Sequence, residues 1–505
     1  MLFLSTIDHQ PWTYKDFIHD DFLIYFCLSS AATSMVLPKS AIVGNGYLIK
    51  SFIFVNQFVN LMMLIQQNIS NKLRKVAILA LGFVIFLIEV AFSQKPVKEY
   101  SNEVAVAWFN LQLRLIPTTP GFSPPVASRA LGYSGLTLYE SLVNGMPEYQ
   151  SLVGVLNEFK TTPKIEAGRN YHWVLAANAA QAAIIKSLYA NTSKINLAKI
   201  DSLKSALERK FQYEVDTETA IRSMKYGEAV AKAIFDYSKS DGGHEGYEKN
   251  FPKDYKPASG ACVWTPTGEQ QIPLQPNWGK NRPFVKGNTD FELPAPPRCE
   301  ASISSLMYAQ ALEVYSVGKN LSAEQTTIAQ YWSDDAGKTF TPPGHAVSIA
   351  SQIIASEKLK LDRTAEVFCK VGIAAADAFI SCWKCKFMHN VLRPVSYIRT
   401  TIDRTWQPIL ETPPFPEYTS GHASVSGATA QVLSDLFGFN YRFTDNSHAA
   451  RGFKPRSFDS FFEFAEEAAN SRLYGGIHYR NSNEQGLKNG KRIGKNVCEL
   501  KFKRG

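Results

Sequence analysis

Apolar residues recur at intervals of three and four along most of the chain after Gln94, which is the spacing of helices that bury one face. Alternation of apolar and polar residues, the pattern of half-buried strands, is scarce. The pattern therefore predicts an all-α protein with two packed helical bundles. Helices are expected over residues 103–115, 128–142, 171–189, 194–211, 217–238, 302–317, 323–333, 347–359, 364–386, 423–437 and 458–474.

One long segment, residues 242–298, interrupts this pattern and is rich in Pro, Gly and Trp. Such a composition breaks helices and is typical of irregular chain. We expect the segment to be an ordered crossover between two helical halves. The chain then divides into an N-terminal helical region, 94–300, which includes the crossover, and a C-terminal helical region, 301–505.

The first 93 residues have a different composition. After Met62 the chain carries a basic stretch, then the apolar run 76–88, then small residues that end at Ser93. Basic, apolar and small residues in this order indicate a secretory signal peptide. We expect 62–93 to be that signal peptide, 1–61 to be a non-native upstream extension, and the mature protein to be exported to the periplasm or the exterior. A membrane-anchored amino terminus is the alternative, although the apolar runs are short or interrupted for a span.

Composition and charge indicate whether the protein is expected to bind nucleic acid or a membrane. With 45% hydrophobic and 20% charged residues, the 505-residue chain has the composition of an ordinary globular protein and the length of two helical units. The formal net charge is +9, but Lys and Arg are scattered among acidic residues and no nucleic-acid-binding motif accompanies them. A solvated basic surface is favoured over a nucleic-acid partner, and no stable membrane span is expected in the mature chain.

The chain has seven cysteines. In an exported protein Cys262 and Cys299 are candidates for a disulfide, although the sequence does not fix the pairing. Cys382 and Cys385 form a C-x-x-C pair, but no second cysteine pair with metal-binding spacing accompanies it. Cys382 and Cys385 are therefore expected to be buried structural thiols.

Candidate chemistry gathers in the last third of the chain, where three short segments supply cations, a hydroxyl, a glycine amide and two imidazoles. This set suits a tetrahedral or trigonal-bipyramidal oxyanion, because cations neutralise equatorial oxygens and the imidazoles can occupy opposite apices. The segments are Lys386 to Arg393-Pro394, Thr419-Ser420-Gly421-His422, and Ser471-Arg472 to His478.

The spacing within these segments constrains the backbone. Lys386 and Arg393 are seven residues apart and would share a helix face if the helix continued, but the proline after Arg393 predicts a distortion or an end close to it. Arg472 and His478 are six apart, which would splay them on a straight helix. The glycine pair 475–476 permits a break that aims both side chains at one point.

This set of segments resembles the superfamily of vanadium-dependent haloperoxidases and type 2 phosphatidic acid phosphatases. Its consensus is a Lys six residues before Arg-Pro, then Pro-Ser-Gly-His, then Ser-Arg five residues before His. One position departs, because Thr419 stands where the family usually has proline. The spacing is most similar to bacterial haloperoxidases of the iodide-oxidising kind, and the resemblance implies a vanadium haloperoxidase-like fold.

The resemblance also implies roles for single residues. His478 would be the metal ligand to vanadium in a vanadate cofactor, and His422 would be the acid–base group. Lys386 would also polarise hydrogen peroxide, so that a halide attacks it and leaves as hypohalous acid. The residues implied to hold the vanadate oxygens are Lys386, Arg393, Ser420, Gly421 and Arg472.

Two aromatic residues match positions on the halide side of haloperoxidases, namely Trp383 and Phe415. Core packing is the alternative for Trp383. The resemblance in spacing to iodide-oxidising enzymes implies that iodide is the best halide, followed by bromide. An apolar wall of the two rings would reinforce this order by favouring a large, weakly hydrated anion, although Phe415 also matches the aromatic residue of chloride-oxidising relatives.

Asp334 is a candidate orienting residue that pairs with Arg393 or Arg472 from a neighbouring helix. A solvated acid at a helix end is the alternative, and Asp335 could take the role instead. His345 matches no family position and is expected to be a surface or core histidine.

Two other functions use the same residues. An exported acid phosphatase would employ His478 as the nucleophile, through a phosphohistidine, and His422 as the acid for the leaving alcohol. Membrane phosphatases of the superfamily carry spanning helices, whereas 301–505 has no long apolar run, and the soluble acid phosphatases are much shorter than this chain. A non-catalytic exported anion-binding protein is the third reading, but such a protein would be expected to lose one of the two histidines.

Overall fold

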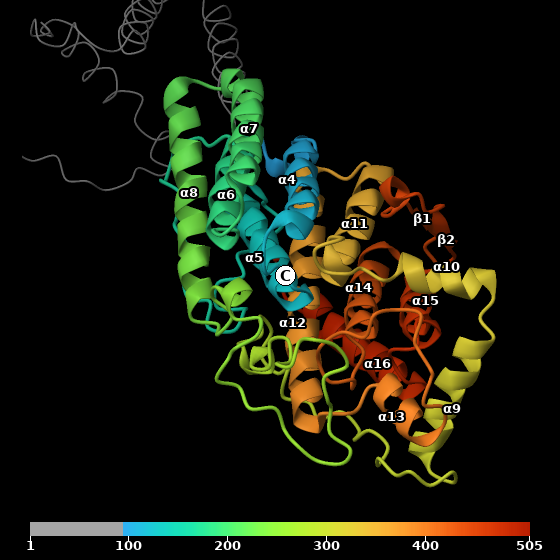
Figure 1. Ribbon diagram of the computed structural model, residues 1–505. Helices are drawn as coiled ribbons and strands as arrows, with labels where there is room; N and C mark the ends of the chain where they lie inside the picture. The colour runs from blue at the N-terminus through green and yellow to red at the C-terminus, as the bar shows by residue number, and fades with distance from the viewer. Residues whose placement is uncertain (1–93, 505) are drawn as a thin grey trace, which may run out of the picture. The chain divides into compact units, whose positions relative to one another are not determined.

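The computed structural model describes residues 94–504, and the expected signal peptide and upstream extension lie outside them. The regular secondary structure of the described chain is helical apart from one short antiparallel sheet, in which β1 (Phe443–Asp445) pairs with β2 (Arg456–Phe458). This confirms the all-α prediction (Figure 1). Among the described residues, no helix is both long enough and apolar enough to cross a membrane.

The N-terminal helices were well predicted, since their apolar stripes are regular. The largest difference in this half is at α5, which begins at Pro124 rather than at residue 128. Proline at the first helical positions loses no hydrogen bond, because the first N–H groups of a helix have no partner within it. The helices of this half are α4 (Glu103–Leu115), α5 (Pro124–Leu142), α6 (Trp173–Leu188), α7 (Lys194–Phe211) and α8 (Thr217–Lys239).

The crossover 242–298 contains short 3-10 turns and no α-helix, as its composition predicts. It is nevertheless tied down. The buried carboxylate of Asp377 accepts hydrogen bonds from the Phe284 N–H at 2.7 Å and the Val285 N–H at 3.0 Å. A disulfide joins Cys262 to Cys299, with 5.9 Å between their Cα atoms. The crossover is therefore an ordered layer against the bundle.

The C-terminal half contains two helices that the apolar pattern did not reveal, α13 and α16, and α11 begins at Thr341 instead of residue 347. α13 is short and begins at Pro394, the residue expected only to end or distort a helix. The helices are α9 (Leu306–Lys319), α10 (Ala323–Tyr331), α11 (Thr341–Ser356), α12 (Leu361–His389), α13 (Pro394–Thr401), α14 (Gly421–Phe437), α15 (Phe461–Tyr474) and α16 (Arg480–Cys498).

α16 was missed because its sequence is polar, and it packs through glycine rather than through large apolar side chains. A Cβ atom on Gly490 would lie 2.1 Å from the Ser424 carbonyl oxygen, and one on Gly486 would lie 2.9 Å from that of Ser420. The helices α14 and α16 therefore approach backbone to backbone. This close contact holds the N-terminus of α14 in place.

α12 runs through the middle of the described chain, between α4 to α8 on one side and α14 to α16 on the other (Figure 1). It packs on α5 from the first half and on α14 from the second. The larger of two apolar clusters in the described chain extends through both halves around it, and the smaller one lies at α9 and α13. The division near residue 300 stays a prediction, since the two halves share this helix and this core.

Candidate active site for an oxyanion

The residues of the three sequence segments converge at one end of α12, and they are buried except for Gly421 and His422, which are partly exposed. Each comes from the end of an element or the turn beside it, where the change of chain direction lets side chains from different elements meet. They are Lys386 in the last turn of α12, Arg393 before α13, Ser420, Gly421 and His422 at the start of α14, Arg472 in the last turn of α15, and His478 before α16.

Lys386 and Arg393 do not share a helix face. The helix ends at His389, and Asn390 follows in the left-handed conformation with φ of 47°. Arg393 then caps the start of α13 instead of extending α12. Lys386 Nζ donates to the carbonyl oxygens of Pro416 and Glu417, both at 2.9 Å. The two cations thus reach the site from different elements.

Each of the two arginines has an N–H group without an acceptor among residues 94–504. Arg393 donates from Nε to the Phe415 carbonyl and from Nη1 to the Ile477 carbonyl, each at 2.9 Å. Its Nη2 is buried and has no partner in the part of the chain that the structure describes. Arg472 donates from Nη1 to the Trp332 carbonyl, and its Nε is likewise unpartnered. Buried guanidinium N–H groups are costly to leave unpaired, so these two fit an oxyanion that accepts from them.

The break between Arg472 and His478 occurs at the predicted glycines. α15 ends at Tyr474, and Gly476 has a φ of 75° that a residue with a side chain rarely adopts. A Cβ atom at Gly476 would also lie 2.9 Å from Pro408 Cβ. This turn returns the chain so that His478 lies within 3.2 Å of Arg393, from Nε2 to Nη1.

The start of α14 adds a favourable potential for an anion. Ser420 is the N-cap, and its Oγ accepts from the Ala423 N–H at 3.4 Å. Gly421 is the first helical residue, where the N–H groups and the helix dipole favour negative charge. Ser420 and Gly421 are therefore placed as an oxyanion requires.

Both imidazoles are kept neutral. Burial, followed by the charges of Arg393 and Lys386, lowers the pKa of His478 well below its ordinary value. Burial and the charge of Arg472 do the same to the pKa of His422. Burial also lowers the pKa of Lys386 to about 8. Neutral imidazoles keep a lone pair for a metal or a proton.

A cavity of about 250 Å³ opens beside this site, and His422, Arg472 and His478 line it. Trp383 and Phe415 form part of its wall, with ring centroids 5.0 Å apart. Lys386 Nζ lies 5.0 Å from the Phe415 centroid, and the Arg393 guanidinium carbon lies 4.8 Å from it. Trp383 is thus both a core residue and a wall of the cavity.

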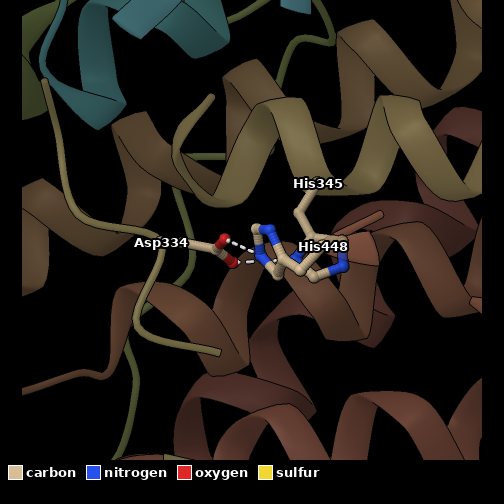
Figure 2. A group of neighbouring side chains, drawn as sticks. All are labelled: Asp334, His345 and His448. Carbon is tan, nitrogen blue, oxygen red and sulfur yellow. Dashed lines mark hydrogen bonds and ion pairs between the residues drawn. The ribbon is translucent and has the colours of Figure 1, made fainter. Parts of the chain in front are cut away.

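Asp334 does not pair with either arginine, which corrects the expectation from the sequence. Its carboxylate lies 2.9 Å from His345 Nδ1 and 2.8 Å from His448 Nε2, and no arginine of the described residues is within ion-pairing distance (Figure 2). Asp334 nevertheless lines the cavity, and its charge opposes the fall in the pKa of Arg472.

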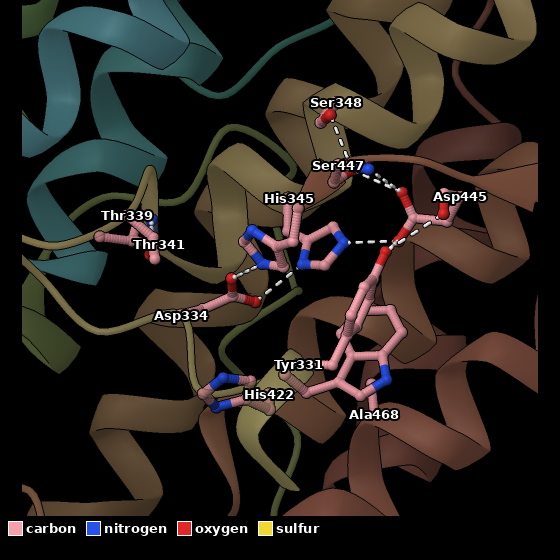
Figure 3. Close-up of polar contacts among 12 residues, drawn as sticks. Tyr331, Asp334, Thr339, Thr341, His345, Ser348, His422, Asp445, Ser447 and Ala468 are labelled. Carbon is pink, nitrogen blue, oxygen red and sulfur yellow. Dashed lines mark hydrogen bonds and ion pairs between the residues drawn. The ribbon is translucent and has the colours of Figure 1, made fainter. Parts of the chain in front are cut away.

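The contacts of Asp334 extend into a buried acid–histidine cluster, which we define as Asp334, His345, His448 and Asp445. His345 Nε2 lies 2.8 Å from Asp445 Oδ2, and Asp445 also accepts from the Tyr331 hydroxyl at 2.7 Å (Figure 3). Although burial alone would lower the pKa of His345, the two carboxylates outweigh it and raise that pKa to about 10.

Asp334, His345 and His448 also have the side-chain types of a metal site. A metal ligand needs a free imidazole lone pair, however, and both ring nitrogens of His345 face carboxylates. The ring is therefore an imidazolium that donates on both sides. We interpret the cluster as a closed ion-pair network.

Sequence reasoning missed Glu417, whose Oε1 lies 2.7 Å from His478 Nδ1. Burial raises the pKa of Glu417 to about 7, while Arg393 and Lys386 oppose that rise. The available signal was a single acid in the otherwise apolar segment 413–418, next to the serine and histidine of the motif. His448 and Asp445 were also missed, because no short spacing links either of them to the motif.

Comparison with known proteins agrees with this geometry. The VCPO second helical-bundle domain family matches residues 366–503. Vanadium chloroperoxidase of Curvularia inaequalis is 24% identical over 495 residues, covering 76% of this chain and 79% of that protein. A bacterial vanadium-dependent chloroperoxidase in its holo form is similar in fold, with a TM-score of 0.57, 18% identity, and coverage of 76% of this chain and 93% of its own.

The crystal structure of a bacterial vanadium-dependent iodoperoxidase is more similar than either chloroperoxidase. It has a TM-score of 0.73 and 33% sequence identity, and the match covers 81% of this chain and 98% of the iodoperoxidase. The chain therefore belongs to the vanadium-dependent haloperoxidase family.

Proposed function

We propose that this protein is an exported, vanadate-dependent haloperoxidase that oxidises iodide, and bromide less well, with hydrogen peroxide to the hypohalous acid. The observation that carries the proposal is the convergence of buried cations on one neutral histidine beside an aromatic-walled cavity, with arginine N–H groups that lack an acceptor within the described chain. A haloperoxidase needs these parts together: an oxyanion site, a metal ligand, and room for a halide.

The residues fit vanadate as cofactor. When bound, vanadate supplies a Lewis acid that activates peroxide for attack by halide. His478 Nε2 is the candidate ligand, because it faces the cations and its ring is neutral. The cations and the start of α14 hold the oxygens by charge and hydrogen bonds: Lys386, Arg393, Arg472, Ser420 and Gly421.

His422 is the proposed acid–base residue. It lines the cavity, and its Nε2 lies 3.4 Å from Arg472 Nη1. Because burial and Arg472 keep this ring neutral, it can take a proton from incoming peroxide and later return it to the leaving oxygen. Lys386 would neutralise negative charge on the peroxide held in the oxyanion site, so that the peroxide becomes a better electrophile.

The order of halides rests on the cavity wall and on desolvation. Trp383 and Phe415 present aromatic faces over the cations. Iodide is the easiest halide to desolvate and to oxidise, so an apolar wall penalises it least. The relative that is 33% identical is described as an iodoperoxidase, which supports the same order, whereas the curated relative at 24% is a chloroperoxidase.

The decisive experiment measures halide oxidation by the purified apoprotein. Iodide, bromide and chloride are supplied in turn with hydrogen peroxide, with and without vanadate, and with phosphate as a competitor. Activity should require vanadate, fall with added phosphate, and decrease from iodide to bromide to chloride. Hydrolysis of phosphate monoesters that vanadate inhibits, with no halide oxidation, would contradict the proposal and favour the phosphatase.

Export is part of the proposal. The Cys262–Cys299 disulfide supports it, because disulfides persist in oxidising compartments. The basic, apolar and small residues before Gln94 support it independently. Cell fractionation followed by amino-terminal sequencing of the exported protein should give a mature chain that starts near Gln94, and retention in the cytoplasm would contradict export.

A further inference from the structure

We propose that Glu417 is a positioning residue, which fixes the tautomer and ring orientation of His478 so that the lone pair of His478 Nε2 would be available to the metal of a bound vanadate. The inference rests on the proposed function, because it gives Glu417 a role through the histidine that would ligate the cofactor. It is not a catalytic residue: His478 lines the cavity and Glu417 does not.

The hydrogen-bond partners of His478 determine which nitrogen carries the proton. Arg393 Nη1 lies 3.2 Å from His478 Nε2, and a guanidinium can only donate. His478 Nε2 must therefore accept, and in a neutral ring the single proton is then on Nδ1. That N–H donates to Glu417 Oε1 at 2.7 Å. The arrangement is the carboxylate–histidine pair that supports metal-ligating histidines in general.

Glu417 is itself held rigidly, which a positioning residue must be. Its Oε1 also accepts the Tyr479 N–H at 3.1 Å, and its own N–H donates to the Val391 carbonyl at 3.0 Å. Its carbonyl accepts from Lys386 Nζ at 2.9 Å. Only 1% of the residue is exposed. One residue thus connects the ligand histidine to the lysine of the site and to the chain just before Arg393.

Without the carboxylate, two things should change. The His478 ring would lose its nearest acceptor, Glu417 Oε1 at 2.7 Å from Nδ1, and keep only the Ser482 hydroxyl at 3.4 Å. The Nε2–H tautomer should therefore become more populated. In that tautomer Nε2 carries a proton, so it can neither accept from Arg393 nor ligate a metal. Loss of such a supporting carboxylate typically weakens metal binding by about 10- to 100-fold.

The test compares Glu417→Ala and Glu417→Gln with the parent. Vanadate affinity of each apoprotein is measured by titration calorimetry, and the histidine tautomers are read from ¹⁵N chemical shifts, with His478→Ala used to assign the signal. We expect Glu417→Ala to bind vanadate about 10- to 100-fold more weakly and to shift His478 toward the Nε2–H form. Glu417→Gln keeps an acceptor oxygen, so it should retain the Nδ1–H form and lose less affinity.

Glu140→Gln is the matched control, since Glu140 is an equally buried carboxylate that accepts from the Leu152 N–H and Ser151 Oγ, on α5. It should leave vanadate affinity unchanged.

An Nε2–H tautomer in the parent apoprotein would overturn the inference, and so would parent-like vanadate affinity in Glu417→Ala. If Glu417→Ala does not fold, the tautomers of the parent and of Glu417→Gln still test the inference. The tautomer is measured without vanadate, so a parent protein that fails to bind vanadate would contradict the proposed function without deciding the role of Glu417.

Discussion

Two buried charged regions meet at the cavity, and they are built in opposite ways. The oxyanion site brings together Lys386, Arg393 and Arg472, and the two arginines have N–H groups with no acceptor among the described residues. The acid–histidine cluster alternates carboxylates and imidazoles, so that the imidazolium of His345 is neutralised from both sides. Charge that is left unpaired serves a ligand, whereas charge that is paired within the protein serves the fold.

This difference predicts how each region responds to its surroundings. A ligand that binds only the folded protein adds stability with increasing concentration, so vanadate or phosphate should raise the melting temperature through the oxyanion site. The acid–histidine cluster should instead respond to pH and to the loss of any one partner, because each member satisfies its neighbour. Mutations can separate these behaviours.

The largest effect is expected for His478→Ala. The variant should lose vanadate retention and halide oxidation together, because the only proposed ligand is removed while the cations alone hold the anion weakly. Equilibrium dialysis with vanadate and steady-state iodide oxidation measure both losses. His244→Ala, a variant in the crossover outside the cavity, should keep both. Parent-like vanadate affinity in His478→Ala would exclude this histidine as the ligand.

His345→Gln tests the other region. Removing the imidazolium leaves two buried carboxylates without their shared partner, so the free energy of unfolding should fall by about 3–5 kcal/mol. Denaturant titration measures the change. His172→Gln is the matched control, because His172 is buried but contacts only one carboxylate, that of the half-exposed Glu214, and caps α6 by accepting the Leu175 N–H; it should cost about 1 kcal/mol. A cost for His345→Gln no larger than the control would show that the cluster is not a stabilising network.

The same network gives a pH dependence with a definite sign. The pKa of His345 is raised to about 10 in the folded protein against about 6.5 when unfolded, so its stabilisation is complete below pH 6.5 and is lost as pH rises toward 10. Lys386 acts in the opposite direction, since its pKa is lowered to about 8. The difference in unfolding free energy between the parent and His345→Gln isolates the histidine and should shrink between pH 7 and 10. A difference that stays constant over this range would remove His345 as a charged group.

The effect of His422→Ala should be smaller than that of His478→Ala, because only turnover and not vanadate binding should be lost. Vanadate should stay bound, held by His478 and the cations, while turnover falls by about 100-fold because the proton transfer is lost. A kcat that falls without loss of vanadate affinity distinguishes this residue from His478. Turnover equal to the parent at neutral pH would exclude His422 from the mechanism.

The two regions also differ in how far the sequence predicts them. The oxyanion residues lie in short segments with fixed spacing. The proline and glycine residues beside them predict the helix ends that orient their side chains toward the site. The cluster joins residues from α11, β1 and the loops beside them, which are far apart in sequence, so only folding reveals that His345 and Asp445 meet. Apolar periodicity likewise predicted the apolar helices but missed α16, which packs through glycines that have no side chain rather than through apolar residues.

The smallest effect is expected at the cavity wall. Phe415 covers the charges of Lys386 and Arg393, and each such contact is worth about 1 kcal/mol. Phe415→Leu keeps an apolar surface but removes the aromatic face, so kcat/KM for iodide should fall by about 3- to 10-fold, with a smaller change for bromide. Phe439→Leu, at an exposed phenylalanine, controls for loss of an aromatic ring elsewhere. Because vanadate affinity should hardly change, a drop confined to iodide would place halide selection in the wall and not in the cations. Equal iodide and bromide losses would instead mean that Phe415 packs the site without choosing the halide.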